Sequence, residues 1–190
     1  MKTVFFDVDT QLDFMFPAGA LYVPGAETIL DHIAVLNHLG HTVISTMDAH
    51  SEDDPEFREW PHHCVAGTLG QRKPSATLLE NRVIAANTPG PIAIAHAHQI
   101  LLEKQTFDCF TNSKLAGILD TLHAERYVVY GVVTEICVKL AAMGLLKTGR
   151  HVELVTDAVR SLTDEANAKM LADFTAAGGV LTTVAKITGV

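Results

Sequence analysis

Short apolar runs of β-forming residues alternate along this chain with segments whose apolar residues recur at helical spacing. Strands that alternate with helices form a mainly parallel sheet covered on both faces, joined by right-handed crossovers. We therefore expect an α/β fold with a three-layer (αβα), doubly wound sheet. The pattern predicts strands at residues 3–8, 42–46, 127–133, 152–156 and 180–184, and helices at 26–39, 113–124, 134–146 and 164–177.

The length and composition narrow the class of protein. A chain of 190 residues, 48% of them hydrophobic, suits one compact domain over residues 1–190. Its net charge of -8 argues against a nucleic-acid or anionic-membrane partner. No apolar run approaches the roughly 20 residues that span a bilayer, and no signal peptide precedes the first strand. Three distant cysteines, Cys64, Cys109 and Cys137, fit reduced thiols, so we expect a cytoplasmic protein.

Two segments lack a regular pattern. Residues 48–75 form a long polar loop, and loops of that length in compact domains are usually functional. Residues 81–104 carry short β-like runs at 82–85, 92–95 and 100–102 around Pro89-Gly90-Pro91. We interpret His96 and His98, which lie between these runs, as surface or hairpin residues.

Chemically active residues follow the predicted strands. Ligands bind beyond the carboxyl ends of the strands in open α/β sheets, so polar residues at those positions identify the site. We expect a carboxylate, a metal-binding pair, a lysine and a cysteine to meet at one sheet edge: Asp9, Asp48 with His50, Lys104, and Cys137.

Cys137 lies in the first turn of a predicted helix, where N–H groups and the helix dipole favour a thiolate and an oxyanion hole. A buried structural role is the alternative. Asp9 is the candidate base for the thiol proton, with Asp7 and Asp13 as competitors. Lys104 would lower the pKa of a neighbouring thiol by its charge, although most lysines are simply solvated.

A second group resembles a metal site. Asp48, His50 and His63 suit a divalent metal such as zinc, iron or manganese, with positions left for water or substrate. Glu56 is a candidate fourth ligand. The alternatives as ligands are His62, Asp53 and Asp54.

Aromatic residues accompany both motifs. Phe14 and Trp60 would form a slot for a flat ring, with ordinary packing as the alternative. We interpret Cys64 and Cys109 as structural, and Asp157 as the cap of a turn.

Taken together, these motifs resemble the isochorismatase-like cysteine hydrolases, and among them the nicotinamidases, over essentially the whole chain. The segments that carry the resemblance are Asp9-Thr10-Gln11-Leu12-Asp13-Phe14, Asp48-Ala49-His50, Trp60-Pro61-His62-His63-Cys64-Val65-Ala66-Gly67-Thr68, Lys104, and Gly131-Val132-Val133-Thr134-Glu135-Ile136-Cys137-Val138.

The resemblance implies a function and a set of roles. It implies a cysteine hydrolase that cleaves the linear amide bond of nicotinamide, or of a similar small aromatic carboxamide, through a thioester, and that forms a homo-oligomer. It implies a metal on the pyridine nitrogen and a cis peptide at 132–133. The implied residues are a triad of Asp9, Lys104 and Cys137, oxyanion N–H groups of Val133 and Cys137, metal ligands Asp48, His50 and His63, and ring-flanking Phe14 and Trp60.

The chain departs from the family pattern in two places. No histidine lies between His50 and His63, so we expect Glu56 to replace that ligand. The segment 70–104 is longer than usual, and we expect an inserted hairpin there. Three rival functions remain: another hydrolase of the superfamily (isochorismatase, carbamoyl-amidase or ureidoacrylate-type), a non-catalytic binding module, and an enzyme whose nucleophile is metal-bound water.

Overall fold

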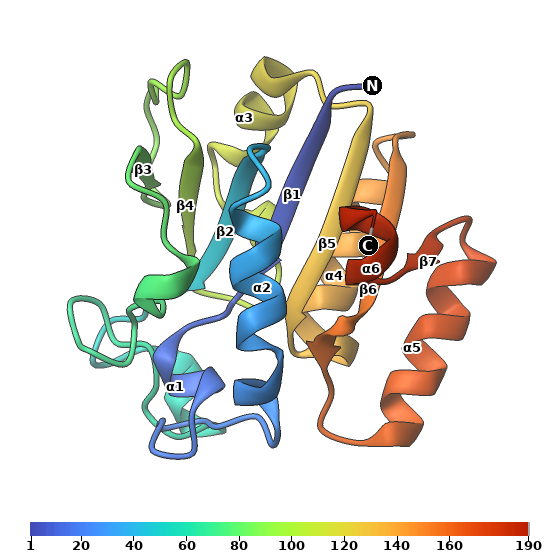
Figure 1. Ribbon diagram of the computed structural model, residues 1–190. Coiled ribbons are helices and arrows are strands. Elements are labelled where there is room, and N and C mark those ends of the chain that lie inside the picture. Colours follow the sequence, from blue (N-terminus) through green and yellow to red (C-terminus); the bar gives the residue numbers. More distant parts are fainter. Residues whose placement is uncertain (190) are drawn as a thin grey trace.

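The computed structural model describes residues 1–189 and has a seven-stranded sheet in which every neighbouring pair is parallel (Figure 1). The strand order is β3-β4-β2-β1-β5-β6-β7, which confirms the predicted α/β class. The strands are β1 Thr3–Val8, β2 Thr42–Asp48, β3 Arg82–Ala85, β4 Gln99–Lys104, β5 Arg126–Val132, β6 His151–Arg160 and β7 Val180–Thr182.

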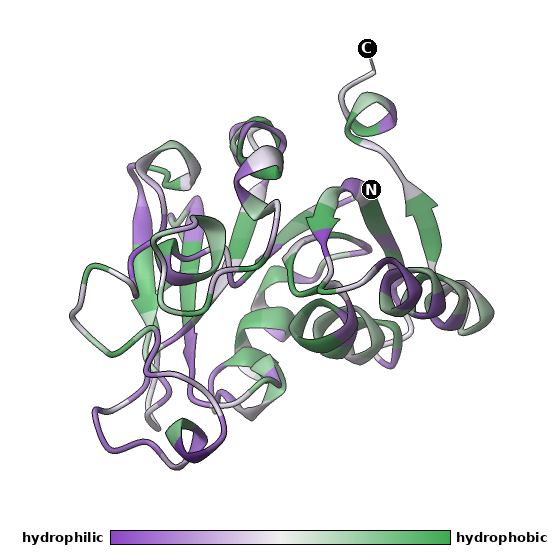
Figure 2. Ribbon diagram, turned by 90° about the horizontal axis from the view of Figure 1, so that it is seen from below, coloured by the Kyte–Doolittle hydropathy of each residue, from purple (hydrophilic) through white to green (hydrophobic). Residues whose placement is uncertain are grey.

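Helices cover both faces of this sheet (Figures 1 and 2). Alternate residues of β1 point to opposite faces, so Val4 and Phe6 pack with the helices of one side and Phe5 with those of the other. The first side holds α3 Leu115–Leu122, α4 Lys139–Leu146 and α5 Asp164–Ala176; the second holds α2 Leu30–Asn37 and α6 Val184–Thr188. Both cores are built from near-continuous apolar strands, as expected for a sheet buried on both faces.

The segment between β3 and β4 corrects one prediction. Residues 92–95 are not a strand, and β3 pairs with β4 in parallel, so no hairpin is inserted there. A parallel pair needs a long crossover, and proline at 89 and 91 lacks the N–H groups that a strand needs. Ile94 instead packs into the core as part of an irregular loop, in which His96 is exposed.

Several element boundaries also differ from the predictions. The helix predicted at 26–39 is a 3-10 turn, Ala26–Ile29, followed by α2, which ends at Asn37. The helix predicted at 134–146 begins as a π-turn, Thr134–Val138, and becomes α4 only at Lys139. The last strand is shorter than predicted because the Thr183 side chain caps α6 instead. The short helices α1 Leu12–Met15 and α6 were not predicted. Within residues 1–189, we find no helix with the length and apolarity required to cross a bilayer.

Candidate active site

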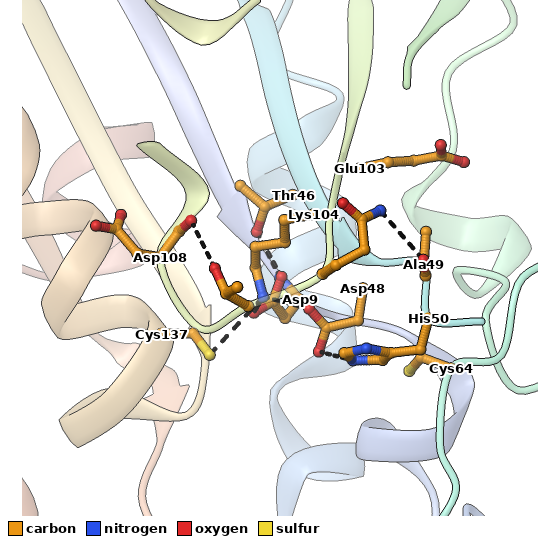
Figure 3. Close-up of polar contacts among 12 residues, drawn as sticks. Asp9, Thr46, Asp48, Ala49, His50, Cys64, Glu103, Lys104, Asp108 and Cys137 are labelled. Atoms are coloured by element: carbon orange, nitrogen blue, oxygen red, sulfur yellow. Dashed lines mark hydrogen bonds and ion pairs between the residues drawn. The ribbon is translucent and has the colours of Figure 1, made fainter. Parts of the chain in front are cut away.

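The sheet order brings four separate segments to one edge. β1 lies between β2 and β5, and β4 lies beyond β2, so their carboxyl ends are neighbours. Asp48 and Lys104 are the last residues of β2 and β4 and are register partners. Asp9 follows β1, and Cys137 lies in the π-turn after β5 (Figure 3). The predicted convergence of these side chains is therefore present in the structure.

Lys104 is the centre of this group. Its Nζ lies 2.9 Å from Asp9 Oδ2 and 4.0 Å from Cys137 Sγ, and it also pairs with Asp48 Oδ1 (Figure 3). The side chain is fully buried. Burial opposes its charge, but the carboxylates of Asp48 and Asp9 outweigh burial and hold the pKa of Lys104 well above its usual range. Lys104 is therefore a fixed cation rather than a proton donor.

Asp9 is held in an unusual backbone conformation. Its φ is 51°, in the left-handed region that most side chains avoid, and aspartate is among the residues that tolerate it. Thr46 Oγ1 donates a 2.6 Å hydrogen bond to Asp9 Oδ1. Burial raises the pKa of Asp9 against the opposing effects of Lys104 and Thr46. A carboxylate with a raised pKa is a stronger base than a solvated one.

Cys137 corrects one expectation. Burial raises the pKa of its thiol well above the usual range, and the lowering by the Lys104 charge does not offset it. The resting group is a thiol, so a neighbouring base has to remove its proton.

The backbone that leads into the turn with Cys137 requires glycine at position 131. The φ of Gly131 is 120°, and a Cβ there would lie 2.1 Å from Val8 O of β1. The peptide bond between Val132 and Val133 is cis, as the resemblance implies.

Asp48, His50 and His63 form a cluster that could bind a metal ion. Their candidate ligand atoms lie within 4.8 Å of one another, and all three residues are buried. His50 Nε2 is buried without a hydrogen-bond partner. His63 Nδ1 donates to Pro61 O at 2.7 Å, which leaves Nε2 as a lone pair facing the cluster. The Nε2 atoms of His50 and His63, together with the carboxylate of Asp48, are therefore a set of ligand atoms that fits a divalent metal.

The remaining candidates around the cluster have different positions. Glu56 Oε1 lies 3.7 Å from His63 Nε2, close enough to remain a candidate ligand. Asp54 is turned away from the cluster: its Oδ2 accepts from His50 Nδ1 at 3.0 Å and its Oδ1 from Glu56 N at 2.9 Å. Asp53 and His62 are exposed, and His62 stacks on Phe57.

The competing aspartates have structural contacts. Asp13 accepts backbone N–H groups of Ala20 at 3.0 Å and Cys64 at 2.7 Å, which folds the polar loop. Asp7 faces α2, where it accepts from Asn37 Nδ2, and it pairs with Lys73 at 3.3 Å in a buried network. The prediction that Asp157 caps a turn after its strand is wrong: Asp157 lies within β6, and its Oδ1 accepts from the N–H of Val184, the first residue of α6, at 2.9 Å.

Gln11 was missed by sequence reasoning. Its amide donates to Asp48 O at 2.9 Å and Gln71 O at 2.8 Å, and its Oε1 accepts from Asp48 N at 2.7 Å. Gln11 therefore joins the ends of β1 and β2 to the polar loop. The one feature of the sequence that could have indicated this role is the position of Gln11 two residues after Asp9, in the same motif.

Above these groups lies a mostly apolar pocket. Phe14 and Trp60 line it, as predicted, along with Val132, Val133 and Cys137. Phe107 also lines it and meets Trp60 edge-on, with ring centroids 6.4 Å apart. Phe107 was not predicted, since nothing in the sequence around it indicates that its loop bends over the site.

The isochorismatase domain model matches residues 3–186. The nicotinamidase of Escherichia coli K12 is 28% identical, over 94% of this chain and 93% of that protein. The pyrazinamidase of Pyrococcus horikoshii, solved in complex with zinc, has a TM-score of 0.80 at 28% identity, over 96% of this chain and 99% of that one. The nicotinamidase PncA of Bacillus subtilis has a TM-score of 0.81 at 25% identity, with 96% and 99% covered.

The fold, the pocket and these likenesses define an amidohydrolase, an enzyme that hydrolyses amide C–N bonds, built on a three-layer α/β fold. Because the family model spans nearly the whole chain, the protein belongs to the isochorismatase family. Within that family it is nicotinamidase-like and pyrazinamidase-like in sequence and fold.

Proposed function

We propose that this enzyme hydrolyses nicotinamide, or a similar small neutral aromatic carboxamide, to the acid and ammonia through a thioester on Cys137. The observation that carries the proposal is the position of Lys104, 2.9 Å from Asp9 and 4.0 Å from Cys137 beneath the apolar pocket. A base, a cation and a nucleophile at these distances are the parts that covalent amide hydrolysis needs.

In this mechanism Asp9 removes the Cys137 proton as the sulfur attacks the carboxamide carbon. The backbone N–H groups of Val133 and Cys137 would hold the oxyanion. When the C–N bond breaks, Asp9 returns the proton to the departing ammonia. Asp9 then takes a proton from water, which attacks the thioester. As the C–S bond breaks, Asp9 returns this proton to the Cys137 sulfur, which restores the thiol and releases the acid. Lys104 stabilises each negative charge without giving up its own proton.

We further propose zinc as the resident metal, with iron and manganese as alternatives, held by Asp48, His50 and His63 with Glu56 beside them. A divalent metal there would supply a Lewis acid that takes the ring nitrogen of the substrate. The fit rests on the buried, unpartnered Nε2 of His50.

The charges of the pocket favour a neutral amide over other substrates of the superfamily. Asp9, Asp48 and Glu56 line it, and among its lining residues, which all lie in the described chain, none is lysine or arginine. Isochorismate and ureido acids carry carboxylates, which would face these acids and would find no lysine or arginine side chain among the lining residues. A neutral carboxamide avoids that cost.

Ammonia release from nicotinamide, measured with and without added zinc or manganese, tests the proposal. We expect turnover, and we expect Cys137→Ala to abolish it while the circular dichroism spectrum and bound metal stay unchanged. Activity retained in Cys137→Ala but lost on chelation would instead favour metal-bound water as the nucleophile. Absence of nicotinamide turnover in the metal-loaded protein would overturn the proposed substrate and would favour another hydrolase of the superfamily or a binding module.

A further inference from the structure

The pocket has an apolar rim that remains in contact with solvent. Its lining passes from buried Val132, 1% exposed, and Phe14, 7% exposed, to Phe107 and Leu162, which are 38% and 46% exposed. Water solvates polar side chains well at positions this exposed, whereas exposing the surface of a large apolar side chain to water is unfavourable in free energy. The apolar character of the ring slot therefore continues outward beyond the buried site.

The two rim residues lie on opposite flanks of the site. Phe107 follows β4 and Leu162 follows β6. In the sheet, β4 and β6 lie on either side of the β2-β1-β5 group whose ends carry Asp48, Asp9 and Cys137. Phe107 and Leu162 therefore line the pocket from opposite flanks of the segment that carries the nucleophile.

Leu162 is held in place by hydrogen bonds. Glu135, two residues before the nucleophile, accepts the Leu162 N–H at 3.0 Å and the Ser161 hydroxyl at 2.6 Å. On the other side, Arg160 donates to Thr28 Oγ1 at 2.6 Å. Both carboxylate oxygens of Glu135 are thus used to fix this loop to the turn that carries the sulfur.

We infer that Phe107 and Leu162 form an outer apolar subsite, which takes an apolar substituent on the ring of the carboxamide substrate; this rests on the proposed function. The enzyme then accepts ring-alkylated aromatic carboxamides as well as the unsubstituted one. Each methyl group that Phe107 and Leu162 cover contributes about threefold to fourfold in affinity, the value of one buried methylene. Glu135 is a positioning residue for this subsite.

Binding to the Cys137→Ala protein, loaded with zinc, tests the subsite apart from catalysis. The probes are nicotinamide and nicotinamides methylated in turn at each hydrogen-bearing ring carbon, measured by titration calorimetry. We expect at least one methylated probe to bind about threefold more tightly than nicotinamide. Adding Leu162→Ser should remove that preference, and adding Glu135→Ala should weaken it. Leu39→Ser, which changes a leucine 38% exposed outside the pocket, should preserve it.

The outcomes separate the two proposals. If every methylated probe binds more weakly than nicotinamide, or if Leu162→Ser leaves the preference unchanged, the outer subsite is wrong while nicotinamide hydrolysis stands. If the wild-type protein fails to hydrolyse nicotinamide but the preference follows Leu162, the proposed reaction is wrong and the subsite stands. If none of the probes binds, both are overturned.

Discussion

Lys104 Nζ lies 2.9 Å from Asp9 Oδ2, and both side chains are fully buried. Removing one partner of a buried ion pair leaves an uncompensated charge in a low-dielectric interior, which costs more than the pair itself contributes. Lys104 also pairs with Asp48, so two buried carboxylates share this ammonium. The reactive geometry and the stability of this sheet edge therefore share one residue.

Lys104→Met should lower both activity and stability. We expect the free energy of unfolding of the metal-free protein to fall by about 3–5 kcal/mol, measured by urea denaturation, with turnover lost. Adding Asp9→Asn to Lys104→Met removes one orphaned carboxylate and should recover part of that stability without recovering activity. A Lys104→Met protein as stable as the wild type would contradict the role of Lys104 as the counter-charge.

The thiol of Cys137 should react slowly with iodoacetamide at pH 6. Burial raises the pKa of the thiol, so less thiolate exists at that pH than on a free cysteine. We expect the labelling rate to rise with pH past 9, the ordinary value for a cysteine. Mass spectrometry that locates the label excludes Cys64 and Cys109, which are also buried. Rapid labelling of Cys137 at pH 6 would show a resting thiolate and remove the need for Asp9 as the base.

Asp54→Asn should weaken metal binding without removing a proposed ligand. Asp54 accepts the Nδ1–H of His50 and the N–H of Glu56, so it directs the other imidazole nitrogen into the cluster. Loss of such a carboxylate typically costs about 10-fold to 100-fold in metal affinity. Competition with a chromophoric chelator measures the affinity for zinc. Asp53→Asn, at the exposed neighbouring position, is the matched control and should leave the affinity unchanged.

The positions of the strand ends could be predicted from the sequence. Runs of apolar residues locate the strands, and the carboxyl ends of parallel strands lie at the same edge of the sheet. The apolar runs located β1, β2 and β5, and parallel pairing then required Asp9, Asp48 and Cys137 to lie at one edge. Lys104 depended on more than this pattern: the β-like run was predicted to end at residue 102, whereas β4 extends to Lys104, and the pairing of Lys104 with Asp9 and Cys137 was implied by the family resemblance.

Contacts between distant loops were not predictable in the same way. Lys73 lies in a polar loop and looks like a solvated lysine, yet the structure buries it against Asp7 and Thr10. Gln11 and Phe107 were missed because their partners, Asp48 and Trp60, are distant in sequence and no periodicity records them. The pKa of Cys137 was misjudged because the sequence shows a nearby lysine but does not show the depth of burial.

The ion pair between Arg126 and Glu153, outside the active site, should make the free energy of unfolding depend on pH in the acidic range. Glu153 of β6 accepts two 2.7 Å hydrogen bonds from Arg126 of β5. Burial opposes the charge of Glu153, but the bonds from Arg126 outweigh it and lower the pKa of the carboxyl below its ordinary value of 4.5. Because the folded-state pKa is lowered, the pair stabilises the fold above pH 4.5, and that contribution is lost as pH falls through the folded-state value.

Glu153→Gln should therefore reduce the free energy of unfolding by about 1 kcal/mol at pH 7, the scale of a well-formed, partly buried bidentate pair. The difference between variant and wild type should shrink as pH falls below 4.5 and vanish once the carboxyl is protonated in both states. Urea denaturation at a series of pH values measures it, with Glu52→Gln, at an exposed loop position, as the control. A difference that stays constant down to pH 3 would mean that the substitution acts through packing between β5 and β6 and not through the charge of Glu153.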